Sequence, residues 1–293
     1  AADDLVYGEL GDDEVYGGDG RDKVWGGDGD DSIYGDAGDD EVLGKEGTDS
    51  LFGGTGDDEI WVGFMNDEKN IGLEQRDQSR DLDFVWGGAG DDTIMGDLGT
   101  DVEYGQAGDD ELCGWGGDDR LYGGAGRDEF NGSDGADLID GGSDLDVVWY
   151  LGSTNGVTVD LSTGTGVGGY ADGDILIGIE AVGGSTWDDV LKGSASDDVL
   201  SGWAGRDEIY GGAGNDQIQG GRNSGLDGDQ MWGGSGDDTF HFSNGHSGGS
   251  VNTIDRIWDF DQFGDDDMHF YVNDVSFAAQ KYPATAATYH GTT

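Results

Sequence analysis

The chain has 293 residues with 62 glycines, a single proline and a formal net charge of −52 at pH 7. This excess of carboxylates argues against nucleic acid or an anionic membrane surface as a partner, because both bind a basic face. It makes a cation the natural partner. No apolar stretch approaches the roughly 18 residues of a membrane span, and the only cysteine, Cys113, excludes an internal disulfide.

From its N-terminus the sequence follows a nine-residue repeat with Gly at position 1 and Asp at position 6. Residues 17–34 contain two consecutive units, GGDGRDKVW and GGDGDDSIY. Two further positions, which do not define the register, support it. Gly fills position 4 of every regular unit except those with Asp144, Trp187 and Ser196, and position 8 is apolar in every regular unit except the one with Glu103.

Each unit is expected to form a turn followed by a very short strand. Positions 1 to 6 form the turn, with Gly where the backbone needs a positive φ or a close approach. In the strand, position 8 points inward while positions 7 and 9 point outward. One inward residue per strand can form a core only if two units make one coil and two parallel sheets face each other. The predicted fold is therefore all-β, a right-handed parallel β-roll.

Interruptions of the repeat divide the chain into six predicted regions. The first unit is preceded by DDLVYG, which matches the tail of a repeat, so we expect this chain to be a piece of a longer polypeptide. Between the second and third blocks, strands are predicted where aliphatic residues alternate, at Val157, Val159 and Leu161 and at Ile175, Ile177 and Ile179. In chain order the regions are a first block of the roll (1–61), an inserted surface loop with the return to the roll (62–86), a second block (87–149), a wider β connector (150–183), a third block with one stretched unit (184–241), and a strand-rich cap that includes the region of a secretion signal (242–293).

The units resemble the RTX nonapeptide, G-G-x-G-x-D-x-U-x, as in GGTGDDEIW (53–61), GGAGDDTIM (87–95) and GGSGDDTFH (233–241). This resemblance implies a parallel β-roll with calcium held between its turns. It also implies export by a type I secretion system, and therefore a secreted or cell-surface location. The last stretch, FAAQKYPATAATYHGTT, lacks the acid-plus-aliphatic ending that some relatives carry.

The aspartates at position 6 are the predicted metal ligands. Units alternate between the two sides of the coil, so Asp22 should lie one layer from Asp40, and Asp31 one layer from Asp49. Carboxylates about 5 Å apart repel each other unless a cation lies between them. Flexible, oxygen-only ligation suits calcium better than magnesium or zinc. A run of n units offers n − 2 complete sites, which predicts roughly 11 to 13 calcium ions.

The predicted ligand set combines side chains with turn carbonyls. The alternative, a run of solvated acids without metal, would require neither a fixed spacing nor an apolar position 8. The predicted carboxylates are Asp13, Asp22, Asp31, Asp40, Asp49, Asp58, Asp83, Asp92, Asp101, Asp110, Asp119, Asp128, Asp137, Asp146, Asp189, Asp198, Asp207, Asp216, Asp229 and Asp238. The carbonyls belong to turn residues such as Gly18, Gly20, Gly27, Gly29, Gly54, Gly56, Gly88, Gly90, Gly124, Gly126, Gly212 and Gly214.

No catalytic constellation is recognised, so the chain itself is not predicted to be an enzyme, although a catalytic domain upstream stays compatible with it. GTGVGG (164–169) matches a nucleotide-binding pattern but precedes no helix of a Rossmann unit. GHSGG (245–249) matches the G-x-S-x-G of hydrolases, but its Ser247 lies in a Gly/Ser loop. Separate surface or cap positions are favoured over a transition-metal site for the four histidines, His241, His246, His269 and His290.

Three functions from different classes remain open. The first is a calcium-triggered folding and secretion module. The second is a structural or adhesive element of a surface layer or filament, and the third is a non-catalytic module of a secreted hydrolase, lyase or epimerase. Aromatic residues at position 9 predict one outer ladder of Tyr16, Tyr34 and Phe52, with Trp25 and Trp61 on the opposite sheet. These rings are expected either to stack on one another within the roll or to bind a flat partner. That partner would be a second copy of the chain or a glycan.

Overall fold

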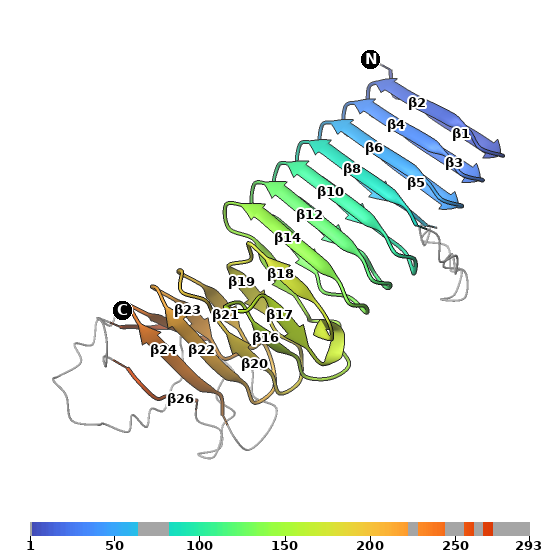
Figure 1. The fold of residues 1–293 in the computed structure, drawn as a ribbon. Helices are drawn as coiled ribbons and strands as arrows, with labels where there is room; N and C mark the ends of the chain where they lie inside the picture. Colours follow the sequence, from blue (N-terminus) through green and yellow to red (C-terminus); the bar gives the residue numbers. More distant parts are fainter. Residues whose placement is uncertain (1, 64–81, 222–227, 244–254, 261–265, 272–293) are drawn as a thin grey trace.

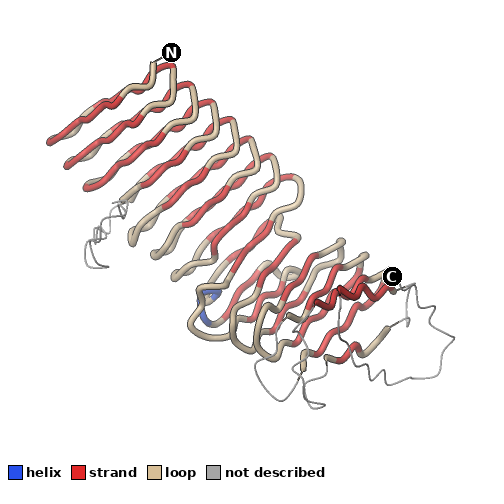
Figure 2. The backbone as a smooth tube through the Cα atoms, turned by 180° about the vertical axis from the view of Figure 1, so that it is seen from behind, coloured by secondary structure: helices blue, strands red, loops and turns tan. Residues whose placement is uncertain are grey.

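The computed structural model describes residues 2–63, 82–221, 228–243, 255–260 and 266–271. These residues form 27 β-strands and one short 3-10 helix, Gly169–Ala171, which lies beside the middle of the chain (Figure 2). The strands are stacked into an elongated roll, with a step in the stack near the connector strands (Figure 1). No helix in the described part of the chain is long and apolar enough to cross a membrane.

Two sheets run along the whole roll, and hydrogen bonds join each strand to the next one in its sheet. The first sheet contains, in spatial order, β1 (Leu5–Leu10), β3 (Lys23–Asp28), β5 (Glu41–Glu46), β7 (Glu59–Trp61), β9 (Thr93–Met95), β11 (Glu111–Cys113), β13 (Glu129–Asn131), β15 (Val147–Trp149), β19 (Ala181–Gly183), β21 (Val199–Ser201), β23 (Gln217–Gln219), β25 (Thr239–Ser243) and β27 (Asp267–Tyr271). The second sheet contains, again in spatial order, β2 (Glu14–Asp19), β4 (Ser32–Ala37), β6 (Ser50–Thr55), β8 (Phe84–Ala89), β10 (Val102–Ala107), β12 (Arg120–Ala125), β14 (Leu138–Ser143), β18 (Ile175–Ile177), β17 (Thr165–Val167), β16 (Thr158–Asp160), β20 (Val190–Lys192), β22 (Glu208–Ala213), β24 (Gln230–Ser235) and β26 (Arg256–Ile257).

Consecutive repeat units alternate between the two sheets, so each strand pairs in parallel with the strand two units away. Val24 pairs with Val42 in the first sheet, and Val15 pairs with Ile33 in the second. Two units therefore make one coil. The prediction of an all-β parallel β-roll is confirmed.

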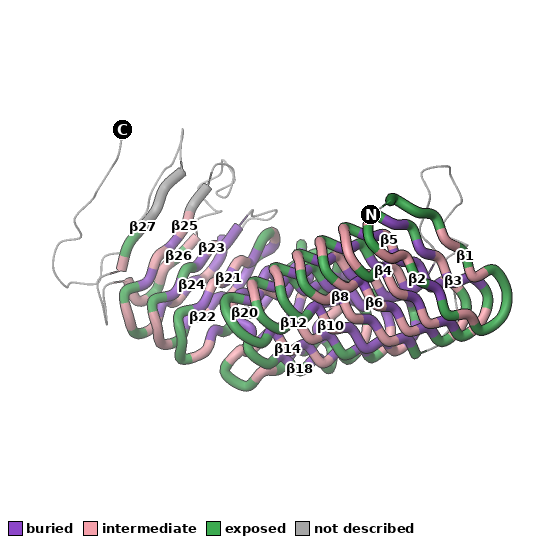
Figure 3. Tube along the Cα trace, turned by 90° about the horizontal axis from the view of Figure 1, so that it is seen from above, coloured by how far each residue is buried: buried purple, intermediate pink, exposed green. Residues whose placement is uncertain are grey.

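The core is a single line of side chains from each sheet, supplied by position 8 of the repeat. Val24 and Val42 from the first sheet and Ile33 and Leu51 from the second are completely buried. Their burial follows from the alternation of side chains along a strand, which turns positions 7 and 9 outward. Figure 3 shows this pattern as buried strand segments enclosed by exposed turns. Glu103 occupies the same line and is also completely buried.

Turn glycines allow successive coils to touch through their backbones. Gly54 and Gly56 have φ values of 122° and 128°, which side-chain-bearing residues rarely adopt. A Cβ atom on Gly54 would collide with the carbonyl oxygen of Asp36 in the preceding coil. The glycine spacing of the repeat is therefore required by the distance between coils.

The connector differs from a simple widened rung of the roll. In the second sheet, β18, β17 and β16 form an antiparallel insertion, whereas β15 pairs directly with β19 in the first sheet. Val157 and Val159 are buried as their alternation suggests, and a strand does lie at 175–177. Its inward residue, however, is Leu176, because Ile175 and Ile177 are 51% and 47% exposed. The strand thus lies where it was predicted, and its buried residue is the one between the two isoleucines.

A continuous ladder of stacked rings covers part of the outer face of the second sheet. Tyr16 stacks on Tyr34, and Tyr34 on Phe52, with ring centroids 4.7 Å apart in both pairs. The ladder continues across the inserted loop, since Phe52 stacks on Trp86 at 4.5 Å. It then continues through Tyr104 and Tyr122. The predicted ladder of Tyr16, Tyr34 and Phe52 is thus confirmed.

The aromatic residues on the first sheet do not form a comparable ladder. Leu43 lies between Trp25 and Trp61 in the strand register. Trp25 instead meets Tyr7 edge-on at 4.7 Å, and the Lys45 ammonium lies 5.3 Å from its ring centroid. The two outer faces of the roll are therefore chemically different.

Candidate metal centre

The position-6 aspartates form two columns, one along each edge of the roll. Position 6 lies two residues before the buried position 8 and therefore faces the same side of the chain. Every predicted carboxylate is buried except that of Asp13, which is partly exposed. The columns are built by the same repeat that builds the core.

One oxygen of most of these carboxylates is fixed by the backbone of the neighbouring coil. The Asp22 N–H donates to Asp40 Oδ1 at 2.8 Å, and the Asp40 N–H donates to Asp58 Oδ1 at 2.8 Å. In the other column the Asp31 N–H donates to Asp49 Oδ1 at 2.9 Å. The partners are 18 residues apart, as the predicted stacking requires. These hydrogen bonds orient each carboxylate and leave its second oxygen for another partner.

The second oxygen faces the glycine at position 1 of its own turn. A Cβ atom on Gly35 would stand 2.7 Å from Asp40 Oδ2 and 2.6 Å from the carbonyl oxygen of Gly53 in the next coil. A carboxylate oxygen and a carbonyl oxygen therefore converge where the side chain is missing. For many of these aspartates, the buried Oδ2 atom has no hydrogen-bond partner among the described residues. They are Asp13, Asp22, Asp31, Asp40, Asp58, Asp92, Asp110, Asp119, Asp128, Asp146, Asp207, Asp216 and Asp238.

The surroundings strongly disfavour an unpaired negative charge at these positions. Burial raises the pKa of Asp58 to about 7, of Asp119 to about 8 and of Asp207 to about 9. Loss of hydration is the largest cause, and other aspartates of the same column raise each pKa further. The hydrogen bond from the adjacent coil acts in the opposite direction. At neutral pH the buried carboxyls of each column therefore favour a bound proton or cation.

The donor set fits calcium. All converging atoms are oxygens, from carboxylates and turn carbonyls, and calcium accepts six to eight such ligands in flexible geometry. The turn glycines predicted as carbonyl donors all have φ values between 106° and 143°, so their turns share one backbone conformation. Bound calcium would supply the positive charge that the paired carboxylates lack, while the chain's own hydrogen bonds hold the Oδ1 atoms.

Two predicted ligands have different surroundings. The Ser185 N–H donates to Asp189 Oδ2 at 2.7 Å, and its hydroxyl donates to Asp189 Oδ1 at 2.8 Å. The Ser194 N–H and hydroxyl contact Asp198 in the same way, at 2.5 and 3.2 Å. Both oxygens of these carboxylates already have donors from the protein. Asp189 and Asp198 are therefore less suited to a cation than the aspartates whose Oδ2 atom has no donor among the described residues.

The structure adds carboxylates that the repeat register does not include. Asp174 accepts the Asp137 N–H at 2.9 Å, and its other oxygen accepts the Tyr150 hydroxyl at 2.7 Å. Glu180 accepts the Asp146 N–H at 3.1 Å. Asp255 and Asp266 extend the two columns by accepting the N–H groups of Asp229 and Asp238. In Asp174, Asp255 and Asp266 the signal was present, since each is followed two residues later by an apolar residue, as in the tail of the repeat.

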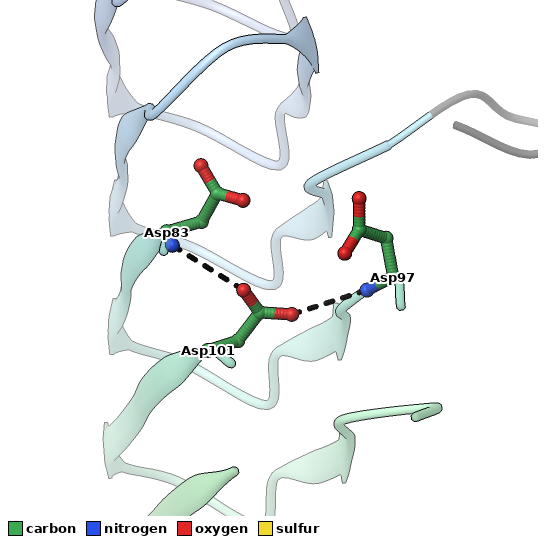
Figure 4. Close-up of side chains that lie close together, drawn as sticks. All are labelled: Asp83, Asp97 and Asp101. Carbon is green, nitrogen blue, oxygen red and sulfur yellow. Dashed lines mark hydrogen bonds between the residues drawn. The ribbon is translucent and has the colours of Figure 1, made fainter. Parts of the chain in front are cut away.

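One cluster of carboxylates departs from the regular columns. Oxygens of Asp83, Asp97 and Asp101 all lie within 4.8 Å of one another. Asp101 accepts hydrogen bonds from the Asp83 and Asp97 N–H groups at 3.3 and 3.2 Å (Figure 4). Asp83 and Asp101 belong to the predicted set. Asp97 occupies position 2 of its unit, where glycine is expected, and was not predicted.

The motifs with alternative chemistry fall mostly outside the described residues. Ser247, His246 and His290 all lie there. His241 and His269 are partners in the register of β25 and β27. The inserted loop is described only at its ends, so its assignment as a surface loop stays a prediction.

Comparison with known families identifies the repeat. The sequence profile of the RTX calcium-binding nonapeptide repeat matches residues 1–24, 7–42, 16–51, 34–67, 80–103, 104–121, 116–148, 184–218 and 224–247. Together these segments cover about two thirds of the chain. A comparison with individual curated proteins gives no match. The matched segments contain both carboxylate columns, and on this evidence of sequence and geometry the chain belongs to the RTX calcium-binding nonapeptide repeat family.

Proposed function

We propose that this calcium-binding β-roll is a folding module that stays unfolded at low calcium and folds at the millimolar calcium found outside cells. The observation that carries the proposal is the column of buried Oδ2 atoms without a donor. Asp31 and Asp40 illustrate it, since each has one oxygen bound to backbone and the other facing a glycine turn. The position-6 carboxylates and turn carbonyls are the proposed ligands, for roughly 11 to 13 ions.

The energetic argument is that the core alone is too thin to hold the roll together. Most strands contribute a single buried apolar side chain, such as Val24 or Ile33. Against this stand the repulsion of stacked carboxylates and a formal charge of −52. Calcium binding only to the folded chain would then supply the free energy of folding.

The cellular setting follows from the same coupling. Cytosolic calcium is far below the affinity range of extracellular calcium modules, so a chain of this kind would stay unfolded inside the cell. An unfolded chain is suited to export, and type I secretion is the route implied by membership of the RTX family. We therefore propose a secreted or cell-surface location, with this roll as a non-catalytic part of a larger protein.

Circular dichroism and size-exclusion chromatography of the purified chain test the folding proposal. In EGTA we expect a disordered spectrum and an expanded elution volume, and in millimolar calcium a β spectrum with compact elution. Magnesium at equal ionic strength is the control, because it separates specific ligation from screening of charge. A full β spectrum and compact elution in EGTA would refute the proposal.

Assembly through the outer faces is a second candidate. The ladder from Tyr16 to Tyr122 supports it, because Tyr16 is 50% exposed and the other rings are partly exposed. Stacking within the ladder accounts for the same rings without a partner. Homo-assembly and glycan binding therefore stay predictions, and sedimentation in millimolar calcium tests the former.

A further inference from the structure

Glu103 is a buried carboxylate in a position that the repeat otherwise reserves for apolar residues. It is 0% exposed, between Val85 and Leu121 in the register of the second sheet. Neither of its carboxylate oxygens has a hydrogen-bond partner among the described residues. A carboxylate in such a place is strongly unfavourable unless it is neutralised. Glu103 must therefore hold a proton or contact a cation.

The Glu103 carboxylate lies where the 26–34 unit places an apolar methyl group. In that unit the tip of the position-8 side chain lies over the glycine at position 1, with Ile33 Cδ1 2.9 Å from the Cβ position of Gly26. The Cβ position of Gly96 lies 2.8 Å from Glu103 Oε1. It also lies 2.7 Å from Asp101 Oδ2 and 2.8 Å from the carbonyl oxygen of Gly114. Three oxygens from three residues therefore meet over Gly96.

These oxygens adjoin the carboxylate cluster of Figure 4, and Asp101 belongs to both groups. Oxygens of Asp83 and Asp97 lie within 4.8 Å of an oxygen of Asp101. The 96–104 unit thus combines its position-6 carboxylate, Asp101, with two extra ones, Asp97 and Glu103.

We propose that Glu103, Asp101 and the Gly114 carbonyl hold a calcium ion over Gly96, beside the carboxylates of Asp83 and Asp97. This inference rests on the proposed calcium-dependent function. The site differs from the repeated ones because it has an additional carboxylate, which approaches from the core. Higher ligand charge increases calcium affinity. This site should therefore hold its ion more tightly than the sites that lack the additional carboxylate.

Native mass spectrometry of the whole chain at buffered free calcium concentrations tests the proposal. The wild-type chain should retain one ion at a free calcium concentration at least tenfold below that at which the remaining ions dissociate. Glu103→Leu, which restores the apolar position, should remove this last-retained ion. Glu103→Gln keeps the shape of the side chain and should weaken binding of the same ion. This second variant keeps the test valid if the leucine variant has a folding defect.

A core substitution that keeps all carboxylates provides the control. Leu121→Met alters the adjacent core position and should leave the last-retained ion in place. Equal ion counts in the wild type, Glu103→Leu and Glu103→Gln at every calcium concentration would overturn the proposal and identify Glu103 as a protonated core residue. A wild-type chain that takes up no calcium would instead overturn the proposed function itself.

Discussion

The first block of the roll and the segment from 150 to 201 bury carboxylates at the same place in the coil but satisfy them differently. In the first block, Asp40 Oδ2 faces a glycine turn and has no donor among the described residues. In the later segment, the Tyr150 hydroxyl donates to Asp174 and the Ser185 hydroxyl to Asp189. The same fold can therefore neutralise a buried carboxylate with a cation or with donors from the protein.

For Asp189 and Asp198, the residue at position 2 of the turn sets the arrangement. The Ser185 and Ser194 hydroxyl oxygens each accept the N–H at position 4, from Trp187 and Ser196, at 3.0 Å. Their turns leave the left-handed conformation of the regular units. Lys45 also replaces glycine at position 2, yet it keeps a φ of 95°. Loss of glycine alone thus does not change the turn; at Ser185 and Ser194 the turn changes where the hydroxyl oxygen closes it locally.

Calcium removal should have the largest effect and should separate the two regions. Hydrogen–deuterium exchange in EGTA is expected to remove all protection from peptides of the first block, 8–61, because repulsion within its columns is no longer compensated. Peptides from 150–201 should exchange more slowly, since protein donors hold their carboxylates. Equal exchange in both regions would show that the serine and tyrosine donors do not replace calcium.

The pH dependence should be the next largest effect. Burial raises the pKa of Asp58 from its ordinary value of 3.8 to about 7. A carboxyl whose pKa is higher in the folded chain stabilises the fold below the unfolded pKa, and this contribution is lost as pH rises through the folded pKa. Without calcium the roll should therefore be most stable in acid and lose stability between about pH 4 and pH 7.

Protons and calcium compete for the same carboxylates, so calcium binding should show the opposite trend. The calcium concentration at the folding midpoint should rise as pH falls from 8 to 6, by up to about tenfold per pH unit for each proton displaced. Calcium titrations followed by circular dichroism measure this shift. A midpoint independent of pH would mean that the buried carboxyls do not ligate the ion.

Single aspartate substitutions should distinguish a cation ligand from a hydrogen-bonded carboxylate. Asp31→Ala should lose up to about two ions, because Asp31 lies between Asp13 and Asp49 in its column. Asp198→Ala should lose none, but should cost roughly 1 to 3 kcal/mol, because the Ser194 donors lose their acceptor. Native mass spectrometry and thermal unfolding in saturating calcium measure the two effects. Loss of an ion from Asp198→Ala would contradict the assignment.

Removing a ring from the aromatic ladder should have the smallest effect. Tyr34→Ser breaks two stacked pairs and should destabilise the calcium-bound roll by ~1–3 kcal/mol. Trp61→Ser on the opposite face is the matched control, because Leu43 and Met95 are its neighbours in the strand register. Chemical denaturation in millimolar calcium measures the loss of stability of each variant relative to the wild type. An equal loss in both variants would mean that stacking contributes nothing beyond burial.

The sequence predicted the regular coils well because each of their requirements repeats. An apolar position 8 gives the core, and Asp at position 6 places carboxylates one layer apart, as the hydrogen bond from Asp22 to Asp40 shows. The phase of the connector strand was harder to predict. Ile175, Leu176 and Ile177 are all aliphatic, so alternation alone does not identify the buried one, and only the pairing with Ile139 places Leu176 inside.

The remaining features depend on contacts that sequence spacing does not encode. The Tyr150 hydroxyl reaches Asp174 across 24 residues of irregular chain. Ser185 and Ser194 redirect their turns through local hydrogen bonds, which a register based on Gly and Asp does not consider. Glu103 was visible as an exception to the pattern, but its position over Gly96 required the three-dimensional structure.

The alternation of units between two sheets imposes a parity rule on changes in chain length. Deleting or adding one nonapeptide would transfer every later strand to the opposite sheet, so the three strands of the connector would interrupt the other face. The ladder that joins Phe52 to Trp86 across the inserted loop would also lose its partners. Duplication or deletion of two units at a time preserves both faces. Evolution and protein engineering should therefore lengthen or shorten such a roll in even numbers of repeats.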